Sequence, residues 1–325
     1  MEIVILDSGY KSYDFEKELF EKNGFRLKIH PDFKGDPSEK KDFAKDADGI
    51  LVRHTKIDET FLSGMKNLKA VVRYGVGYDN VDIEACTRHG VRVANVQGYA
   101  NHAVSDHALA LMFSCSRALW NTRSQLHQGF ATPPVPEVFE LHDKVLGIIG
   151  LGRIGTVLCK KASPFFQQVL ACDPYKPESH FKQLNVQRVD LDELLERADV
   201  ISLHCNLTEE TRHLLSREKF SLMTRKPVLI NTSRGEVISE EALLEALNSG
   251  KIHSAGLDVY EDEPVTHRQS GLTDHPRTIC TGHYAWYSDR SMIELQRKAA
   301  INLLDLLMGN EVEDRLNAPA QQPRT

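Results

Sequence analysis

Residues 144–173 read KVLGIIGLGRIGTVLCKKASPFFQQVLACD, and this stretch decides the fold of the second half of the chain. The apolar run 144–149 is typical of a buried strand, and the segment 156–162 predicts a helix. A Gly-x-Gly-x-x-Gly turn joins them, and a second apolar run, 169–172, ends at Asp173. A strand, a glycine turn, a helix and a strand that ends in an acid together form the arrangement that binds a dinucleotide.

The spacing of the three glycines gives each a separate task at a pyrophosphate. Gly150 allows the tight turn, Gly152 lets the backbone approach the phosphates, and Gly155 lets the helix pack closely on the strand. The first amides of the helix then point at the phosphates. Asp173 can accept hydrogen bonds from ribose hydroxyls and would repel a 2′-phosphate, so the pattern favours NAD over NADP. A glycine-rich turn that binds nothing is the alternative, and it leaves the acid in register unexplained.

The segment 1–98 also alternates short strands with helices, which indicates a parallel sheet covered on both faces. Gly24 and Gly90 stand where two helices should end, as left-handed glycines do. The predicted strands are 2–6, 26–29, 49–52, 69–72 and 91–94, and the predicted helices include 13–23, 58–65 and 81–89.

A different pattern separates the two halves. The apolar periodicity over 101–128 predicts one long helix, and the proline-rich stretch 131–136 predicts an irregular arm. Strand and helix alternate again from Val145 to about Thr281, and 289–308 predicts a final helix. The predicted fold class is α/β, with two doubly wound parallel-sheet domains, flavodoxin-like and Rossmann, and a cleft between them.

Composition excludes several classes of protein. Lys and Arg number 40 against 46 Asp and Glu, a net charge of −6, which offers no electrostatic footprint for nucleic acid or an anionic membrane. No apolar run approaches the roughly 20 residues that cross a bilayer, and no signal sequence is evident. The six cysteines lie singly, without a Cys-x-x-Cys, so no metal site or disulfide framework is expected. We therefore expect a cytoplasmic protein.

Three residues that can do chemistry follow buried apolar runs in the second half of the chain: Arg234, Glu263 and His283. In a parallel sheet, ligands bind outside the carboxyl ends of the strands, so all three can face one cleft. Each alone has an ordinary explanation, as a surface arginine, a solvated acid before a proline, or a core histidine. Beside a dinucleotide site, the three together form a coherent reaction centre.

These motifs make the chain recognisable. It resembles the D-isomer-specific 2-hydroxyacid dehydrogenase family along nearly its whole length. The matching stretches are RYGVGYDNVD (73–82), GIIGLGRIG (147–155), LINTSRGEVI (229–238), GLDVYEDEP (256–264) and the GHYAWYS segment around His283. LHCNLTEETRHLL (203–215) and AWYS (285–288) resemble the C-terminal-binding-protein-like branch most closely.

The resemblance implies domain boundaries and an assembly. A substrate domain would comprise 1–98 and 289–325, with the final helix returning to it, and 99–288 would be the NAD-binding domain. The helix and arm at about 101–140 would form the contact of a homodimer. The implied cofactor is NAD(H), and the implied ligand is a small 2-keto or 2-hydroxy acid.

The resemblance also assigns residues. Those expected to contact the cofactor are Gly150, Gly152, Arg153, Ile154, Gly155, Asp173, Thr232 and Asp258, and those expected to contact the substrate are Arg73, Val76, Gly77 and Trp286. The implied catalytic residues are Arg234, Glu263 and His283. His283 would donate a proton to the keto oxygen as hydride reaches the carbon, and act as base in reverse. Glu263 would hold the other ring nitrogen, and Arg234 would stabilise the developing negative charge.

Two features bear on the substrate and the rate. Arg73, Arg53 and His54 would add positive charge, which favours a substrate with a second anionic group. Gly282 stands where the family usually has proline before the histidine, so the preorganisation of His283 is in question.

Two other functions fit the same motifs. An NAD-responsive binding protein, resembling the co-repressors of the closest branch, would show weak or no turnover. A formate or phosphite dehydrogenase on the same scaffold is the third, although formate enzymes typically differ around the histidine.

Overall fold

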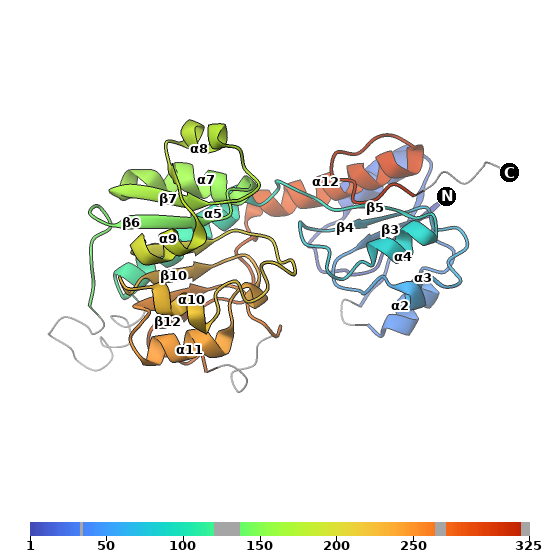
Figure 1. Cartoon of the computed structure of the whole chain (residues 1–325). Helices are drawn as coiled ribbons and strands as arrows, with labels where there is room; N and C mark the ends of the chain where they lie inside the picture. Colours follow the sequence, from blue (N-terminus) through green and yellow to red (C-terminus); the bar gives the residue numbers. More distant parts are fainter. Residues whose placement is uncertain (33–34, 120–136, 264–270, 320–325) are drawn as a thin grey trace. The chain divides into compact units, whose positions relative to one another are not determined.

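Strands and helices alternate along most of the chain (Figure 1). The computed structural model describes residues 1–32, 35–119, 137–263 and 271–319. The chain divides into two compact bodies: unit 1, Met1–Ala100 with Ser288–Thr325, and unit 2, Asn101–Tyr287. Unit 2 is therefore inserted between two separate parts of unit 1.

Unit 1 contains a five-stranded parallel sheet with the order β2-β1-β3-β4-β5. Its central strands are continuous apolar runs because helices cover both faces, and Val4 and Ile50 are fully buried. The strands are β1 (Glu2–Ile5), β2 (Arg26–Ile29), β3 (Gly49–Val52), β4 (Ala70–Arg73) and β5 (Arg92–Ala94). The helices are α1 (Asp14–Lys22), α2 (Pro37–Phe43), α3 (Glu59–Leu62), α4 (Ile83–Arg88) and α12 (Asp289–Met308).

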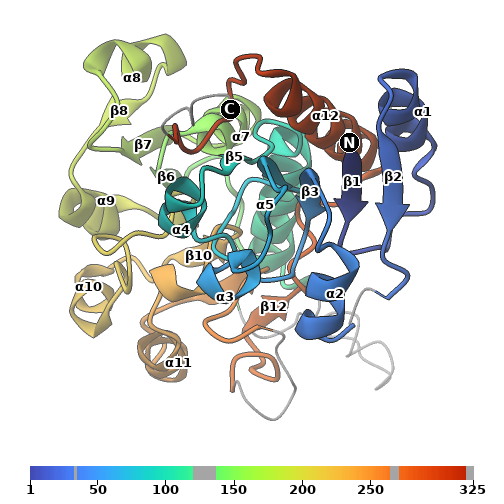
Figure 2. The same cartoon turned by 90° about the vertical axis from the view of Figure 1, so that its right-hand side faces the viewer.

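Helices α1 and α12 lie together on one side of this sheet, and α2, α3 and α4 lie on the other (Figure 2). A capping box begins α12: the Ser288 side chain accepts from the Ser291 amide, and the Ser291 side chain accepts in return. Gly309, with a φ of 84°, ends the helix in the left-handed conformation. Gln296 of α12 donates from its side-chain amide to Glu16 of α1 at 2.8 Å.

Unit 2 contains a seven-stranded parallel sheet with the order β12-β11-β10-β9-β6-β7-β8. Alternate residues of each strand face opposite sides: Val200 packs with α5 and α7, whereas Ile201 packs with α9, α10 and α11. The strands are β6 (Val145–Ile149), β7 (Gln168–Cys172), β8 (Gln187–Arg188), β9 (Val200–Leu203), β10 (Val228–Asn231), β11 (Ser254–Leu257) and β12 (Thr278–Cys280). The helices are α5 (Asn101–Ser116), α7 (Arg153–Ala162), α8 (Glu178–Leu184), α9 (Leu191–Arg197), α10 (Arg217–Leu222) and α11 (Glu240–Asn248), with short 3₁₀ turns at Ser163–Phe165 and Gly235–Val237.

The predicted fold class, two α/β bodies with parallel sheets, is confirmed. Gly24 and Gly90 are left-handed as expected, with φ of 76° and 73°. The prediction of one long helix over 101–128 is wrong. Helix α5 ends at Ser116, whose carbonyl accepts a hydrogen bond from the Phe139 amide at 3.1 Å. Ala118 then turns left-handed, with a φ of 47°, which interrupts the helical hydrogen bonds.

The rest of that predicted helix from residue 120, and the predicted arm 131–136, lie outside the described residues. Within the described part of the chain, none of the helices combines the length and apolar character needed to cross a bilayer.

Candidate active site

Close contacts leave no room for a side chain at two of the three glycines in the turn after β6. Gly150 has a φ of 92°, and a Cβ there would lie 2.7 Å from the backbone nitrogen of Cys205. A Cβ on Gly155 would lie 2.0 Å from the Gly150 carbonyl oxygen. Around Gly152, by contrast, a Cβ would meet no atom within 4 Å. The turn is therefore packed from beneath and open above the start of α7, where a pyrophosphate fits.

Asp173 lies at the carboxyl end of β7, beside this turn. Its carboxylate accepts hydrogen bonds from the amides of Leu151 at 2.8 Å and Tyr175 at 3.0 Å. Thr232, just after β10, has a buried hydroxyl with no hydrogen-bond partner among the described residues. A fixed acid for the ribose, an open helix start and an unsatisfied buried hydroxyl all fit a bound dinucleotide.

The three predicted catalytic residues all belong to unit 2, and two of them are in direct contact. The His283 Nδ1 and Glu263 Oε2 atoms are 2.6 Å apart, with side chains 42% and 33% exposed. The other oxygen of Glu263 accepts from the Tyr260 amide at 3.1 Å. Burial raises the pKa of Glu263, but the hydrogen bond and charge of His283, with the charge of Arg234, outweigh it and hold that pKa below its ordinary value. Glu263 is therefore ionised, and its carboxylate contacts the His283 ring at Nδ1.

A close approach of two loops brings Arg234 toward this pair. A Cβ on Gly235 would lie 1.8 Å from the Tyr260 carbonyl carbon, so only glycine lets the loop after β10 lie against the loop after β11. The Arg234 guanidinium donates to the Ser233 carbonyl at 2.7 Å, which holds the side chain near its own backbone.

Asp258 fastens the loop that carries His283. It is 1% exposed, and its carboxylate accepts from the amides of Tyr284 at 3.1 Å and Ala285 at 2.9 Å. Its main-chain carbonyl accepts from the His283 amide at 2.8 Å. Trp286 donates from its indole nitrogen to the His283 carbonyl at 3.0 Å. Asp258 and Trp286, both predicted as binding residues, thus hydrogen-bond to the loop that carries His283.

Unit 1 carries three of the predicted substrate residues, Arg73, Val76 and Gly77, at and after the carboxyl end of β4, and Trp286 belongs to unit 2. The Arg73 guanidinium folds back over Gly75 and donates to the Tyr74 carbonyl at 2.8 Å. Arg53 stacks on the Tyr10 ring, 5.3 Å from its centroid. Arg73 therefore lies against the loop that contains Val76 and Gly77.

His54 does not add positive charge as predicted. Burial, with the charges of Arg53 and Arg73, lowers the pKa of His54 to about 4, so the ring is neutral at neutral pH.

A buried ion pair organises the loop that carries Arg53 and His54. The Lys40 ammonium lies 2.6 Å from the Asp7 carboxylate, and the two side chains are 4% and 0% exposed. The second carboxylate oxygen of Asp7 accepts from the amides of residues 53, 54 and 55 at 2.7, 2.8 and 3.0 Å. Burial raises the pKa of Asp7, but the hydrogen bonds from Lys40 and Thr55 outweigh it and lower that pKa to about 2.

Comparison with known proteins identifies the chain. Residues 109–285 match the sequence profile described as D-isomer specific 2-hydroxyacid dehydrogenase, NAD binding domain. The chain belongs to this family. It is an oxidoreductase of the 2-hydroxyacid dehydrogenase type, and its cofactor is NAD(H).

The chain is similar to proteins that include two curated enzymes and one solved structure. The hydroxypyruvate reductase of Thermotoga maritima is 37% identical over 80% of this chain and 83% of the relative. The D-3-phosphoglycerate dehydrogenase of Methanocaldococcus jannaschii is 35% identical over 85% of this chain, which spans 52% of that longer protein. The crystal structure of D-lactate dehydrogenase from Aquifex aeolicus with NAD and lactic acid is 29% identical, with a TM-score of 0.83 over 95% of this chain and 96% of that one.

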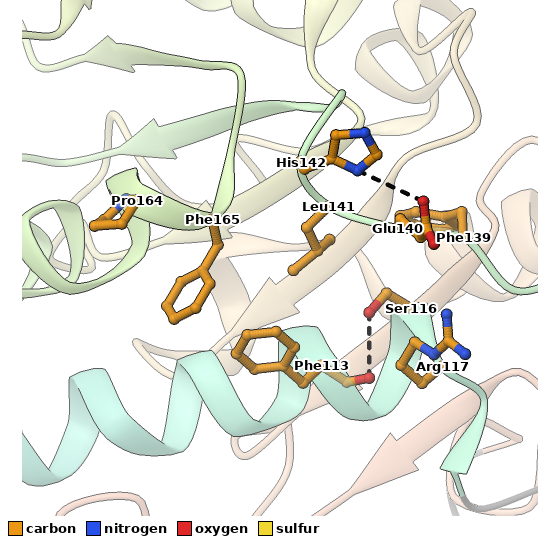
Figure 3. Close-up of a pocket in the computed structure, with 9 residues that line it drawn as sticks. All are labelled: Phe113, Ser116, Arg117, Phe139, Glu140, Leu141, His142, Pro164 and Phe165. Carbon is orange, nitrogen blue, oxygen red and sulfur yellow. Dashed lines mark hydrogen bonds and ion pairs between the residues drawn. The ribbon is translucent and has the colours of Figure 1, made fainter.

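The dehydrogenase has a separate pocket at the end of α5, with a volume of about 330 Å³ (Figure 3). Phe113 and Phe165 form an edge-to-face pair across it, with centroids 5.1 Å apart. None of the three predicted catalytic residues lines it. The lining residues are Phe113, Ser116, Arg117, Phe139, Glu140, Leu141, His142, Pro164 and Phe165.

Sequence reasoning missed three residues: Lys40, and also His107 and Thr281, which hydrogen-bond to each other while Thr281 bonds to Asp258. Lys40 lies in a charged helix, SEKKDF, and nothing in that pattern marks it as a buried partner of Asp7. His107 lies among the apolar residues of α5, and Thr281 follows β12 as an ordinary strand-end threonine. Only their contacts in the fold reveal them. In the same described ranges, no group of three or more His, Cys, Asp or Glu side chains is placed to hold a metal ion.

Proposed function

We propose that the protein interconverts a 2-keto acid and a D-2-hydroxy acid, with His283 as the general acid and base. The observation that carries the proposal is the 2.6 Å contact between His283 Nδ1 and Glu263 in the unit that holds the dinucleotide turn. Because Glu263 takes Nδ1, Nε2 is the nitrogen left to exchange a proton with the substrate. A histidine fixed at one nitrogen by a carboxylate is the usual arrangement of a catalytic base.

The overall reaction is balanced by one hydride and one proton. When bound at the glycine turn of unit 2, NAD(H) would supply the hydride exchange with the keto carbon in either direction. His283 Nε2 gives the proton to the keto oxygen, which becomes the hydroxyl. Glu263 keeps the ring in place and stabilises the imidazolium. Arg234 binds the keto oxygen or the carboxylate and stabilises the negative charge that grows during the transfer.

The roles of the two units follow from these residues. We assign cofactor binding to unit 2, through Gly150, Gly152, Arg153, Ile154, Gly155, Asp173, Thr232 and Asp258. We assign substrate recognition mainly to unit 1, where Arg73 and the amides of Val76 and Gly77 bind the substrate carboxylate, and to Trp286 of unit 2.

The charges in unit 1 favour a substrate with a second anionic group. Arg53 and Arg73 both lower the pKa of His54 by their charges, so the two guanidinium groups share one electrostatic environment. A phosphorylated or dicarboxylic keto acid suits these positive charges. Hydroxypyruvate, which appears in the name of the Thermotoga maritima relative, has no second anionic group and serves as the comparison substrate.

We also propose a homodimer that forms through the region of α5 and the following arm. The pocket of Figure 3 offers apolar surface at this place, and the nearby side chains of Leu119, Val138 and Phe165 are 51%, 39% and 41% exposed. Exposed apolar side chains around a pocket are typical of a surface that a partner covers.

The deciding experiment follows NADH absorbance with a panel of 2-keto acids that includes monoanionic and dianionic members. His283→Ala is compared with His89→Ala, since His89 also contacts a carboxylate, Glu59, at 2.7 Å but belongs to unit 1, which does not contain the dinucleotide turn. We expect turnover that only His283→Ala abolishes, with kcat/KM highest for a dianionic acid.

Each component has its own refutation. Full turnover by His283→Ala would disprove the role of that residue, and a monoanionic acid with the highest kcat/KM would disprove the second anionic group. Tight NADH binding without turnover of any acid would instead support an NAD-responsive binding protein of the C-terminal-binding-protein-like branch. The names of the relatives, all reductases or dehydrogenases, favour the enzyme.

A further inference from the structure

A chain of hydrogen bonds runs from α5 to the loop that carries His283. The Thr281 hydroxyl lies 2.5 Å from Asp258 Oδ1 and 3.0 Å from His107 Nε2. The same hydroxyl is 3.4 Å from the Leu257 carbonyl, which is too long to compete with the carboxylate. The Asp258 carboxylate accepts at both oxygens: Oδ1 from this hydroxyl and the Tyr284 amide, and Oδ2 from the Ala285 amide.

The distances fix which group donates in each hydrogen bond between His107, Thr281 and Asp258. Thr281 has one hydroxyl hydrogen, and the shortest contact, to the Asp258 carboxylate, takes it. The contact with His107 must then have the histidine as donor, so His107 carries its proton on Nε2. Burial lowers the pKa of His107, while the charge of Asp258 raises it. A neutral ring with Nε2 protonated satisfies the whole arrangement.

The His283 loop has a particular need for such support. His283 has a φ of 53°, in the left-handed region that non-glycine residues disfavour. Gly282 precedes it, and a Cβ there would meet no atom within 4 Å, so neither a stiff residue nor close packing restrains the backbone at this point. The restraint has to come from the residues to which the loop is bonded.

We propose that Thr281 and His107 are positioning residues for His283, acting through Asp258 to hold the loop 281–285 in its active conformation. The inference rests on the proposed function, because it assumes that His283 is the proton donor. The Tyr284 ring packs edge-to-face on His107, with centroids 5.1 Å apart, so the histidine supports the loop on both sides of His283. The network replaces the stiffness that glycine at position 282 does not supply.

Thr281→Val tests the hydroxyl, because valine keeps the shape and removes both hydrogen bonds. Thr281→Ser restores the hydroxyl, and Thr278→Val is the matched control. Thr278 also lies at β12 and bonds to the carbonyls of Leu272 and His275, at 2.5 and 2.9 Å, but not to Asp258. The readouts are kcat and KM for the best keto acid, and amide hydrogen exchange of the peptide that contains Tyr284 and Ala285.

We expect Thr281→Val to lower kcat about tenfold with KM within about twofold, and to speed exchange of the loop amides by about the same factor. Thr281→Ser should behave like the wild type, and Thr278→Val should keep kcat and the loop exchange. At the α5 end of these hydrogen bonds, His107→Phe should have the same effect as Thr281→Val. His107→Gln, whose amide nitrogen can take the place of Nε2–H, should restore most of the activity.

The inference is overturned if Thr281→Val leaves the loop exchange unchanged, or if valine and serine at position 281 are equally impaired. Hydrogen exchange does not depend on turnover. Retained activity in His283→Ala would therefore refute the proposed function alone, while unchanged loop exchange in Thr281→Val would refute the positioning role alone.

Discussion

Replacement of Lys40 by methionine should strongly destabilise unit 1. The change keeps the length of an apolar stem and removes the ammonium that lies 2.6 Å from Asp7 in a site where the two side chains are 4% and 0% exposed. Removal of one partner from a buried pair costs about 3–5 kcal/mol, because the other charge stays behind without its partner. The Asp7 carboxylate keeps bonds from the Thr55 hydroxyl at 2.6 Å and from three main-chain amides. We therefore expect the lower end, about 3 kcal/mol, or roughly a hundredfold in the opening equilibrium.

The suitable assay is hydrogen exchange measured by mass spectrometry on peptides that cover β1 and β3. It reports on unit 1 separately, whereas unfolding of a two-unit chain need not be a single transition. Lys69→Met is the matched control: Lys69 also pairs with an aspartate, Asp48, at 2.7 Å, but its side chain is 51% exposed. An exposed pair contributes at most about 1 kcal/mol.

The double variant Asp7→Asn/Lys40→Met separates the charge from the hydrogen bonds. The side-chain amide oxygen that the substitution places at position 7 can still accept from the loop amides, and no unpaired charge remains. The double variant should therefore be more stable than Lys40→Met alone. If Lys40→Met is no more destabilising than Lys69→Met, or if the double variant is worse than the single one, the buried ion pair is not what holds this loop.

Further predictions concern acid, turnover, packing and the cofactor. The pKa of Asp7 falls to about 2 on folding, so its contribution to stability is complete above about pH 4 and disappears as the pH falls toward 2; circular dichroism should show an acid transition that moves to higher pH in Lys40→Met. Glu263→Gln removes the charged partner of His283 and should lower kcat/KM by about ten- to a hundredfold in steady-state assays, and an unchanged value would contradict the role given to that contact. Gly235→Ala places a Cβ 1.8 Å from a neighbouring carbonyl carbon, so the two site loops must separate, and kcat should fall at least about tenfold while NADH titration still gives binding. Asp173→Ser removes the carboxylate that repels a 2′-phosphate and should raise the ratio of kcat/KM for NADPH to that for NADH; no change in the ratio would remove Asp173 from cofactor selection.

The fold and the dinucleotide turn were predictable because the information for them is local. Apolar runs with β-branched residues mark the buried parallel strands, and the spacing of Gly150, Gly152 and Gly155 marks the turn. The contact between His283 and Glu263 joins residues 20 positions apart. The strand ends placed both residues at the same edge of the sheet, and the family resemblance supplied their pairing.

Features set by distant contacts were not predictable. The end of α5 depends on a hydrogen bond from Phe139 to Ser116, and the apolar periodicity of the helix continues past that point unaltered. The charge of His54 is suppressed by burial and by Arg53 and Arg73, a combination that no local pattern shows. Thr281 is an ordinary residue type whose role depends on partners from another helix and strand.

The insertion of unit 2 has a consequence for the order of folding during synthesis. Unit 2 is one continuous segment, so all of its sheet is synthesised before α12. Unit 1 has to wait, because α12 covers β3 and β4, and Asn302 and Asp314 bond to the main chain at Asn95 and Gln97. The apolar strands 49–52 and 70–73 thus remain open on the face that α12 covers while roughly 190 further residues are translated. A chain released after Tyr287 should therefore contain a folded cofactor unit and a unit 1 whose sheet is exposed on one face, a state that favours aggregation.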